Sequence, residues 1–438
     1  MIWMDAMAPR SLPSSTPPGP QAGNTTSVIP WPTWLRLAWA WLAVAAFGLW
    51  GHAWLAAPLA PTTAIVCFAV LFVTIVAASF GVVKEADLLA HRLGEPYGTL
   101  ILTLSIVLIE VILIASVLLG PGEFPTIGRD SIFAVMMIIV NLVMGLCLVV
   151  GGLRHGEQEY NAQGTSAYLS MIMLLTALAL VLPNQLSGAG QFSGTQSWAI
   201  AGVTALLYAV FLALQMGSQR RLFIQPAPGS MWVPARPGGV VGAAVAAPAA
   251  PAASVAPVAQ AAPVGHAAPV APVTSVAPLA AVAPAASRAG LWLSTILLLA
   301  MIVPIVLLAH HLAIVIDYGV MTAGAPVALS GLLIAIIVFT PESITAVKAA
   351  RNDEMQRAIN LCLGAFVSTV GLTVPAVLII GQVTGKTVTM GISGLETVLL
   401  VATVLLSLLS FKGQRTSVLQ GYMHLVLFLV YGFLLFSH

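Results

Sequence analysis

The chain has 438 residues, of which 59% are hydrophobic and only 7% are charged. A soluble domain carries about a quarter charged residues, so this chain lacks the polar groups that would cover a globular surface. Lipid must therefore surround much of it. The formal net charge of +2 is too small to indicate a nucleic-acid partner. The three cysteines, Cys67, Cys147 and Cys362, lie in apolar stretches and are typical of packing residues.

Eleven segments are apolar and long enough to cross a bilayer, which takes about 20 residues. They follow a Pro- and Ser-rich stretch, residues 1–31, that predicts a disordered tail rather than a cleaved signal peptide. The first six predicted helices are 32–52, 61–83, 97–120, 130–152, 166–184 and 196–217. The other five are 290–314, 325–347, 358–381, 393–411 and 416–437. The sequence thus predicts an all-α polytopic membrane protein.

Residues 218–289 separate the two groups of helices. From 226 to 287 this segment consists almost wholly of Ala, Pro and Val. Proline has no N–H group and a restricted φ, so frequent prolines exclude a spanning helix. We expect an extended linker that is partly polyproline II.

The lysines and arginines are distributed asymmetrically about these spans. If the N-terminus is cytoplasmic, only Arg129 and Lys386 fall in outer loops, and the other fourteen of the sixteen cations fall on the inner side. This asymmetry follows the positive-inside rule. It predicts a cytoplasmic N-terminus and linker and an outer C-terminus.

The chain also carries signs of an internal duplication. Apart from the extra helix at 32–52, five predicted helices lie in each of the two halves, 61–217 and 290–438. An odd number of spans gives the halves opposite orientations, which is the inverted-repeat plan of many secondary transporters. Glu110 and Glu342 are 232 residues apart, and each lies in the second helix of its half.

These two glutamates are expected in the hydrocarbon region, where a carboxylate costs at least about 2.5 kcal/mol. No cation lies within a helical turn of Glu110. A helix-end acid that reaches the interface is the alternative for each, but their matching places in two repeats favour a functional pair. Pro341 precedes Glu342 and frees the carbonyl of Ile337. Both a broken helix that exposes this carbonyl to an ion and an ordinary proline kink remain open.

Two carboxylates that face one cavity suit an exchange mechanism. A cation bound between them displaces protons, and protons displace the cation. Oxygen ligands suit Ca²⁺ and also Na⁺ or K⁺. The candidate supporting ligands are Ser105, Asn141, Asn360, Ser368 and Thr369, and Glu95 is a candidate at the cytoplasmic mouth. Asn141 is equally suited to an interhelical contact, and single hydroxyls often bond to their own backbone. No cofactor is expected; the partners are lipid, inorganic cations and protons.

Several ordered blocks resemble a known family. The stretch from Gly94 to Leu102 that leads to Glu110, the segment from Gly151 to Asn161, and the stretch from Ala325 to Asn360 are similar to ChaA-like calcium/proton antiporters. These belong to the CAX branch of the cation/Ca²⁺ exchanger superfamily. The resemblance covers most of the chain after about residue 80, apart from the linker.

This resemblance implies eleven helices, inverted five-helix repeats, alternating access, the plasma (inner) membrane of a bacterium, an ion site at Glu110 and Glu342, and a family asparagine at Asn141. The Gly-Asn pair that usually precedes each repeat glutamate is absent, because Ile106-Val107 and Val338-Phe339 occupy that region. We therefore expect a secondary antiporter that exchanges Ca²⁺ for H⁺, and monovalent Na⁺/H⁺ or K⁺/H⁺ exchange stays open. A cation channel is a more distant alternative. An enzyme is not expected, because the sequence has no H-E-x-x-H motif and no paired aspartates in its helices.

Overall fold

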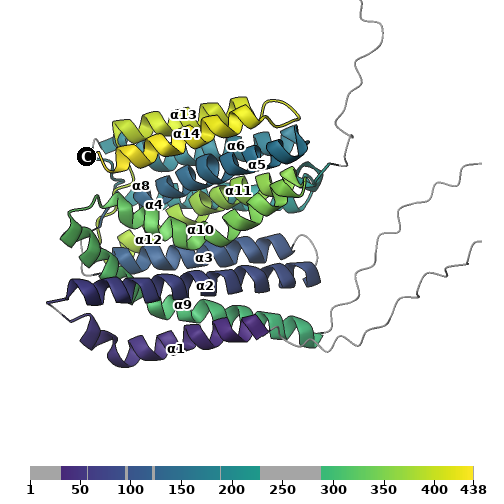
Figure 1. The fold of residues 1–438 in the computed structure, drawn as a ribbon. Coiled ribbons are helices and arrows are strands. Elements are labelled where there is room, and N and C mark those ends of the chain that lie inside the picture. Colours follow the sequence, from purple (N-terminus) through teal and green to yellow (C-terminus); the bar gives the residue numbers. More distant parts are fainter. Residues whose placement is uncertain are drawn as a thin grey trace, which may run out of the picture.

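Helices account for nearly all of the described chain. The computed structural model describes residues 31–56, 58–93, 97–120, 124–187, 189–226 and 288–437, and residues 1–30 and 227–287, which hold nearly all of the predicted tail and linker, lie outside these ranges. Across the described ranges the helices form one bundle (Figure 1), and the only β structure is a bridge between Glu159 and Arg415.

The first half of the chain forms α1 (Trp31–Trp54), α2 (Pro61–Leu93), α3 (Tyr97–Leu118), α4 (Ile127–Met136), α5 (Met144–His155), α6 (Ala162–Thr176), α7 (Leu182–Ser187) and α8 (Gly194–Met216). The second half forms α9 (Arg288–Ala323), α10 (Ala328–Arg351), α11 (Met355–Ser368), α12 (Val374–Thr384), α13 (Gly394–Ser410) and α14 (Val418–Leu435).

Three of the spans change helix type part of the way along. The π-helical segments η1 (Met137–Val143), η2 (Ala177–Val181) and η4 (Thr369–Thr373) join α4 to α5, α6 to α7 and α11 to α12. Each joined pair is one continuous span. A π-helical turn is usually a short insertion into an α-helix and is frequent at functional sites. The sequence analysis did not predict these segments.

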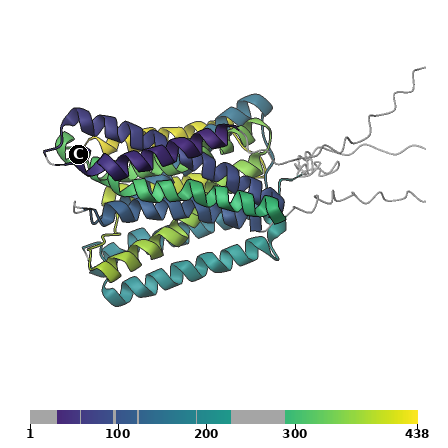
Figure 2. The same cartoon turned by 90° about the horizontal axis from the view of Figure 1, so that it is seen from below.

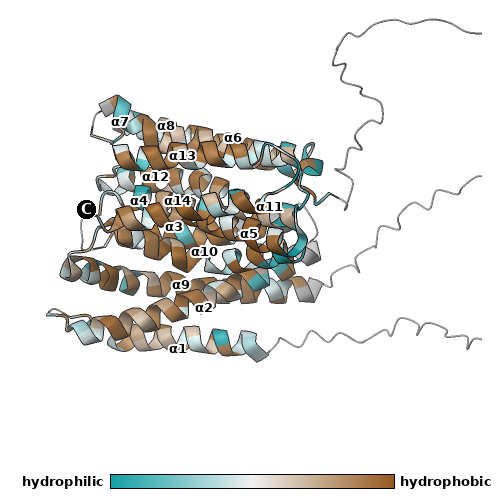
Figure 3. Cartoon of the chain, turned by 45° about the horizontal axis from the view of Figure 1, so that its top comes forward, coloured by the Kyte–Doolittle hydropathy of each residue, from teal (hydrophilic) through white to brown (hydrophobic). Residues whose placement is uncertain are grey.

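With these pairs joined, the structure confirms the eleven predicted helices and the all-α fold. Within the described residues, nine helices are long and apolar enough to cross a membrane, and the apolar helices Leu104–Leu118 and Gly394–Ser410 are shorter. Figure 3 shows apolar residues along the helices and hydrophilic residues gathered toward the loops at their ends. The three cysteines are free and buried, as packing residues should be.

The first helix of each half is longer than predicted. α2 has 33 residues and α9 has 36, although their apolar patterns predicted ends at 83 and 314. Both helices continue through polar residues. No proline interrupts either extension, and Gly319 is accommodated within α9. α9 ends where Gly324 adopts a φ of +59°, a left-handed conformation that glycine tolerates and that commonly ends helices.

The two halves are closely interleaved. α2 and α9 lie side by side (Figures 1 and 2) and are in contact along their length. α10, from the second half, packs against α4 and α5 of the first. At this crossing Gly331 lies so close to α4 that a Cβ atom on it would be 2.6 Å from the backbone carbon of Asp130. The absence of a side chain at position 331 therefore sets how closely the halves approach.

α1 is the extra helix before the first of the two predicted halves, and it packs against α2 and α9. The Trp41 indole donates a hydrogen bond to the Ala300 carbonyl on α9 at 3.1 Å. Ten residues further along α1, Gly51 lies directly against the His311 ring. Trp34 and Trp54, near the two ends of the helix, are 48% and 39% exposed. α1 and α9 thus run alongside each other with a fixed register.

The ends of the described segments agree with the predicted orientation. The start of α1, the end of the segment that follows α8 and the start of α9 lie at one end of the bundle, and the C-terminus lies at the other (Figure 1). The distribution of lysines and arginines predicts this arrangement, with the first group inside. We refer below to these two ends as the inner and outer ends.

At the inner end, loops from both halves are tied together by buried polar groups. The Gln158 side-chain amide donates to the Ala350 carbonyl and to Asp353 Oδ1, both at 2.9 Å. The Tyr160 hydroxyl donates to the Gly413 carbonyl at 2.8 Å. Burial raises the pKa of the Tyr160 phenol above its ordinary value, so the group remains a protonated donor.

The first residues of the predicted linker belong to this inner-end packing. Arg220–Phe223 form a short 3₁₀ helix, η3. The Phe223 carbonyl accepts a hydrogen bond from Asn360, and the Gln225 side chain accepts one from the Gln356 backbone. The Phe223 ring also packs edge-on against Tyr168, with centroids 5.1 Å apart. Residues 220–225 therefore anchor the end of the first half to the second.

At the outer end, Arg129 joins the two halves. Its Nη1 donates to the Gly391 carbonyl at 2.7 Å, and its Nε donates to Asp130 Oδ1 at 2.9 Å. Asp130 is 3% exposed, and Thr126 donates a hydrogen bond to its other oxygen at 2.7 Å. This ion pair is therefore largely removed from solvent.

We expect Arg129→Ala to lower the unfolding temperature of the purified protein by several degrees. The change leaves Asp130 buried without its cation, and removing one partner of a buried pair costs about 3–5 kcal/mol. Thermal unfolding in detergent measures the effect, with Lys386→Ala as a control because that side chain lies in an exposed loop. Equal unfolding temperatures for the two variants would contradict the assignment.

Candidate functional site

Glu110 lies on α3 and is completely buried. Its Oε2 accepts a hydrogen bond of 2.8 Å from the hydroxyl of Thr369, the first residue of η4. The Thr373 hydroxyl, at the other end of η4, is near the same carboxyl group. Neither that hydroxyl nor Glu110 Oε1 has a hydrogen-bond partner among the described residues. A glutamate of the first half is thus held by a π-helical segment of the second.

Glu342 lies on α10 and is 6% exposed. Its Oε2 has no hydrogen-bond partner among the described residues, and the charged group that acts on it is Glu110. α3 and α10 are in contact, as the inverted repeats predict for two glutamates that approach from opposite sides. In the described part of the chain neither glutamate forms a salt bridge. Two uncompensated carboxyl groups in a buried site are costly unless protons or a cation neutralise them.

α10 passes through Pro341 as one α-helix from Ala328 to Arg351. Ile337, whose carbonyl the proline leaves without its usual donor, is fully buried. The structure therefore does not have the broken helix that was one of two interpretations of Pro341. Irregular backbone occurs instead in the neighbouring spans, at η1 and η4, and η4 is the segment that contacts Glu110.

Asn141 is buried on η1 but bonds to neither glutamate. Its amide nitrogen donates to Thr403 Oγ1 at 2.9 Å, and its Oδ1 is 3.0 Å from His424 Nδ1. His424 Nε2 in turn lies 3.2 Å from Ser410 Oγ. Two roles were predicted for Asn141, contact with the ion and contact between helices. This structure contains the contact between helices, which links η1 to α13 and α14.

The other predicted site residues are dispersed. Ser368 precedes Thr369 but donates its hydroxyl to the Ala365 carbonyl of its own helix at 2.7 Å. Ser105 is buried on α3, more than a helical turn before Glu110. Asn360 lies at the inner end, where it bonds to Gln356 and to the Phe223 carbonyl. Glu95 lies outside the described residues. Of the five predicted supporting ligands, only Thr369 is bonded to a glutamate.

The sequence analysis missed His424, Thr403 and Ser410. Each is buried in a predicted span, and His424 is fully buried. A histidine in an otherwise apolar stretch, Leu425-Val426-Leu427 on one side and Tyr422-Met423 on the other, is the signal that was present. Polar residues within a membrane span mark functional or interhelical positions, so the same cost argument that selected the glutamates applies to His424.

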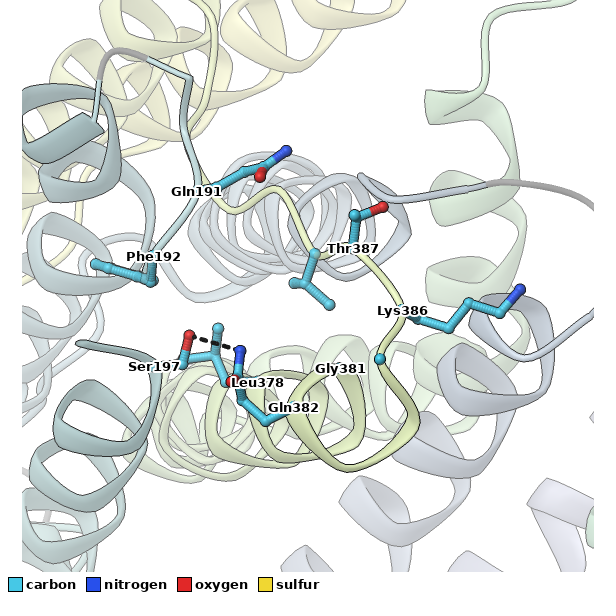
Figure 4. A pocket seen from close by; sticks show the side chains of 10 residues that line it. Gln191, Phe192, Ser197, Leu378, Gly381, Gln382, Lys386 and Thr387 are labelled. Atoms are coloured by element: carbon cyan, nitrogen blue, oxygen red, sulfur yellow. Dashed lines mark hydrogen bonds between the residues drawn. The ribbon is translucent and has the colours of Figure 1, made fainter. Parts of the chain in front are cut away.

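A cavity of about 220 Å³ opens at the outer end, between the loop that precedes α8 and the loop that follows α12. Gln191, Gln382 and Lys386 line it, and Figure 4 shows the Gln382 amide directed toward Ser197, to which it donates at 3.3 Å. The cavity does not include either glutamate. α12, which carries Gln382, continues inward to η4 and so connects the cavity wall to the segment that contacts Glu110.

Thr369→Val is expected to raise the KM for the transported cation about tenfold. Valine has nearly the same shape but leaves Glu110 without its hydrogen-bond donor, and a hydrogen bond to a charged group contributes about 1.5–3 kcal/mol. Cation-dependent transport in membrane vesicles gives the KM. Thr369→Ser keeps the hydroxyl and should remain within a factor of two of the wild type (order-of-magnitude expectation). Equal KM values for the Val and Ser variants would remove Thr369 from the site.

Comparisons with known proteins identify the family. The family model described as sodium/calcium exchanger protein matches residues 63–217 and 293–437. These two matched segments coincide with α2–α8 and α9–α14, so they fall on the two halves and leave out α1 and the linker.

Two curated proteins are similar over most of their length. The sodium-potassium/proton antiporter ChaA of Escherichia coli is 31% identical over 366 residues, which cover 83% of this chain and 87% of that protein. A putative ionic transporter of Sinorhizobium fredii, y4hA, is 32% identical over 396 residues, 90% of this chain and 94% of that protein.

Solved structures show the same fold. Native YfkE matches with a TM-score of 0.63 at 18% identity and covers 93% of this chain and 100% of its own. The H⁺/Ca²⁺ exchanger CAX matches with a TM-score of 0.61 at 14% identity and covers 93% and 89%. The chain is a multi-pass transporter rather than an enzyme, and it belongs to the sodium/calcium exchanger family.

Proposed function

We propose that this protein is a secondary antiporter that exchanges a cation for protons, and that Glu110 and Glu342 bind the two in competition. The observation that carries the proposal is the pair itself. Two glutamates from opposite repeats are buried in one region, each has a carboxyl oxygen without a hydrogen-bond partner, and no described cation pairs with them. Their negative charge requires a mobile partner, and protons or a metal cation satisfy that requirement alternately.

Ca²⁺ is the cation that the chemistry of the glutamates supports best. Two carboxylates match the charge of one divalent ion, and when bidentate they supply four oxygens. The Thr369 and Thr373 hydroxyls bring two more oxygens to the Glu110 side. Six oxygen ligands are within the range that Ca²⁺ takes. None of these ligands is a nitrogen or sulfur atom that would select a softer metal.

A monovalent cation is the second candidate. The similarity at 31% identity to a sodium-potassium/proton antiporter favours it. The chain also lacks the Gly-Asn pairs before the repeat glutamates, so fewer side-chain oxygens surround the ion than in the wider superfamily. One carboxylate charge then balances Na⁺ or K⁺, and the second glutamate retains a proton.

Everted membrane vesicles test the proposal and distinguish the two candidates. A respiratory substrate acidifies the vesicle interior, and a pH-sensitive dye records the gradient. Addition of the transported cation should dissipate the gradient only in vesicles that contain the protein. Ca²⁺, Na⁺ and K⁺ are added separately, each as the chloride, with choline chloride as the control. If none of the three cations dissipates the gradient beyond the choline control, the antiport proposal is wrong.

We also propose that each half is one repeat of the alternating-access machine, 61–217 and 290–438, in a bacterial plasma membrane. The matching family segments and the opposite directions in which α2 and α9 run (Figure 1) support this division. α1 then stands outside the exchange machinery, and the connection between residues 218 and 289 lies on the cytoplasmic side.

A further inference from the structure

The two repeats place their π-helical segments at equivalent positions. The 232-residue separation that relates Glu110 to Glu342 also relates Met137 to Thr369, and these are the first residues of η1 and η4. The same separation relates Asn141 to Thr373. If the two halves were in equivalent states, Asn141 would contact Glu342 in the same way that Thr373 and the rest of η4 contact Glu110.

The structure departs from this equivalence at one point. η4 engages Glu110, whereas the amide of Asn141 bonds to Thr403 on α13 and His424 on α14 and not to Glu342. Glu342 Oε2 meanwhile lacks a hydrogen-bond partner among the described residues. η1 is nevertheless in contact with α10, the helix that carries Glu342. Glu110 thus has its partner from the opposite repeat. Asn141, the partner expected for Glu342, is bonded to α13 and α14 instead.

His424 is the residue that holds it. An amide oxygen only accepts hydrogen bonds, so the His424 Nδ1 that lies 3.0 Å from Asn141 Oδ1 carries the proton. In a neutral ring the Nε2 is then an acceptor, and the Ser410 hydroxyl at 3.2 Å donates to it. Both ring nitrogens are satisfied, and the ring is fully buried. Ser410 therefore orients the ring so that its donor faces Asn141.

We propose that His424 is a positioning residue that retains Asn141 in the access state seen here and releases it to Glu342 in the opposite state. The proposal rests on the antiport function proposed above. His424 does not contact the cation; it sets the free-energy difference between the two states through one hydrogen bond. Thr403, which accepts from the Asn141 nitrogen at 2.9 Å, completes the retaining site.

Three substitutions of His424 separate this role from a general structural one. An asparagine nitrogen occupies the position of histidine Nδ1, so His424→Asn keeps the donor to Asn141. A glutamine nitrogen occupies the position of Nε2, so His424→Gln keeps only the contact with Ser410. His424→Leu removes both contacts. If the hydrogen bond to Asn141 is the relevant one, the Asn variant resembles the wild type and the Gln variant resembles the Leu variant.

The first readout is the KM for the cation at each face, measured in everted and right-side-out vesicles. Loss of a hydrogen bond shifts a two-state equilibrium by about five- to tenfold. Because apparent affinity depends on the fraction of protein in the competent state, the KM should fall at one face and rise at the other. We expect this opposite shift in His424→Gln and His424→Leu and not in His424→Asn. If the Leu variant does not accumulate, the Gln variant carries the test.

The second readout does not need transport. Ser105→Cys on α3, in a background in which Cys67, Cys147 and Cys362 are replaced by alanine, is labelled with a membrane-impermeant maleimide added at each face. Because Ser105 is buried in this structure, labelling reports the opening of an access path to α3. The labelling rate should change about fivefold in the His424→Gln background and remain unchanged in His424→Asn. Unchanged labelling and unchanged KM values in His424→Gln would overturn the proposal, and so would equal shifts in the Asn and Gln variants. A wild type without exchange would refute the antiport function alone.

Discussion

Glu110→Gln and Glu342→Gln are each expected to reduce cation-dependent proton movement in everted vesicles by about 100-fold or more. Glutamine removes one charge from the desolvated pair that the glutamate forms with the bound cation. Removing one charge from such a pair costs about 2–5 kcal/mol, and 1.4 kcal/mol corresponds to a tenfold change in an equilibrium constant. Glutamine is nearly isosteric with glutamate, and its carbonyl still accepts the hydrogen bond that Thr369 donates to position 110. The fold should therefore survive while the exchange site loses its proton- and cation-binding group.

Glu354→Gln is the matched control for this pair. Glu354 is an inner-end acid whose side chain is 42% exposed and pairs with Arg357 at 3.1 Å. An exposed ion pair contributes about 0–1 kcal/mol, so this variant should transport as the wild type does. Wild-type exchange in either Glu110→Gln or Glu342→Gln, with protein amounts equal, would show that the glutamate is not part of the transport site.

Gly331→Ala is expected to destabilise the protein by about 1–3 kcal/mol or more and to suppress exchange. The new methyl group would lie 2.6 Å from the Asp130 backbone carbon and the Ser131 backbone nitrogen on α4. Because these are backbone atoms within a helix, no side chain can rotate away to make room. α10 must move, and it carries Glu342. Thermal unfolding in detergent and vesicle transport measure the two effects.

The same substitution at Gly202 is the control. Gly202 lies on α8, and a Cβ atom there has nothing within 4 Å. Alanine is favoured over glycine in a helix by about 0.5–1 kcal/mol, so Gly202→Ala should leave stability unchanged or slightly higher. The sign of the effect should thus differ between two chemically identical changes. A loss of stability at position 202 equal to that at 331 would show that the effect comes from helix propensity in the membrane and not from the close contact between α10 and α4.

Hydropathy and charge were sufficient to predict the number of spans and the all-α architecture. Each span is a run of apolar residues whose length matches the bilayer. The predicted inner location of all lysines and arginines except Arg129 and Lys386 constrains the number of spans. The separation of Glu110 from Glu342 then indicated the duplication. These are one-dimensional regularities, and a membrane makes them unusually informative because every spanning segment must satisfy its own backbone hydrogen bonds.

The supporting residues of the site were less predictable. A π-helical segment adds a residue to a turn without changing composition, so Met137–Val143 and Thr369–Thr373 have no hydropathy signature. Sequence also does not show which way a buried amide points. Asn141 could reach either Glu342 or α14, and its contact with His424 depends on how α13 and α14 pack against η1. Pro341 was a misleading signal, because α10 continues through it.

α1 fixes the depth of the whole bundle in the bilayer. Trp34 and Trp54 are 20 residues apart, which is about 30 Å along a helix and equals the thickness of the hydrocarbon layer. Tryptophans concentrate at the two membrane–water interfaces, so these two residues mark the boundaries of that layer. The contacts of Trp41 with Ala300 and of Gly51 with His311 transfer this scale to α9.

On that scale the hydrocarbon layer ends near residue 314 of α9, and the helix continues to Ala323. The last turns of α9, with Asp317, therefore lie beyond the outer boundary of the hydrocarbon layer, and one oxygen of the Asp317 carboxyl group is buried against the protein there. By the 232-residue relation, the corresponding turns of α2 carry Glu85, which is 2% exposed. The tryptophan scale thus places one acid of each half close to a membrane boundary, one at either end of the bundle, and both acids pack against neighbouring residues instead of projecting into solution.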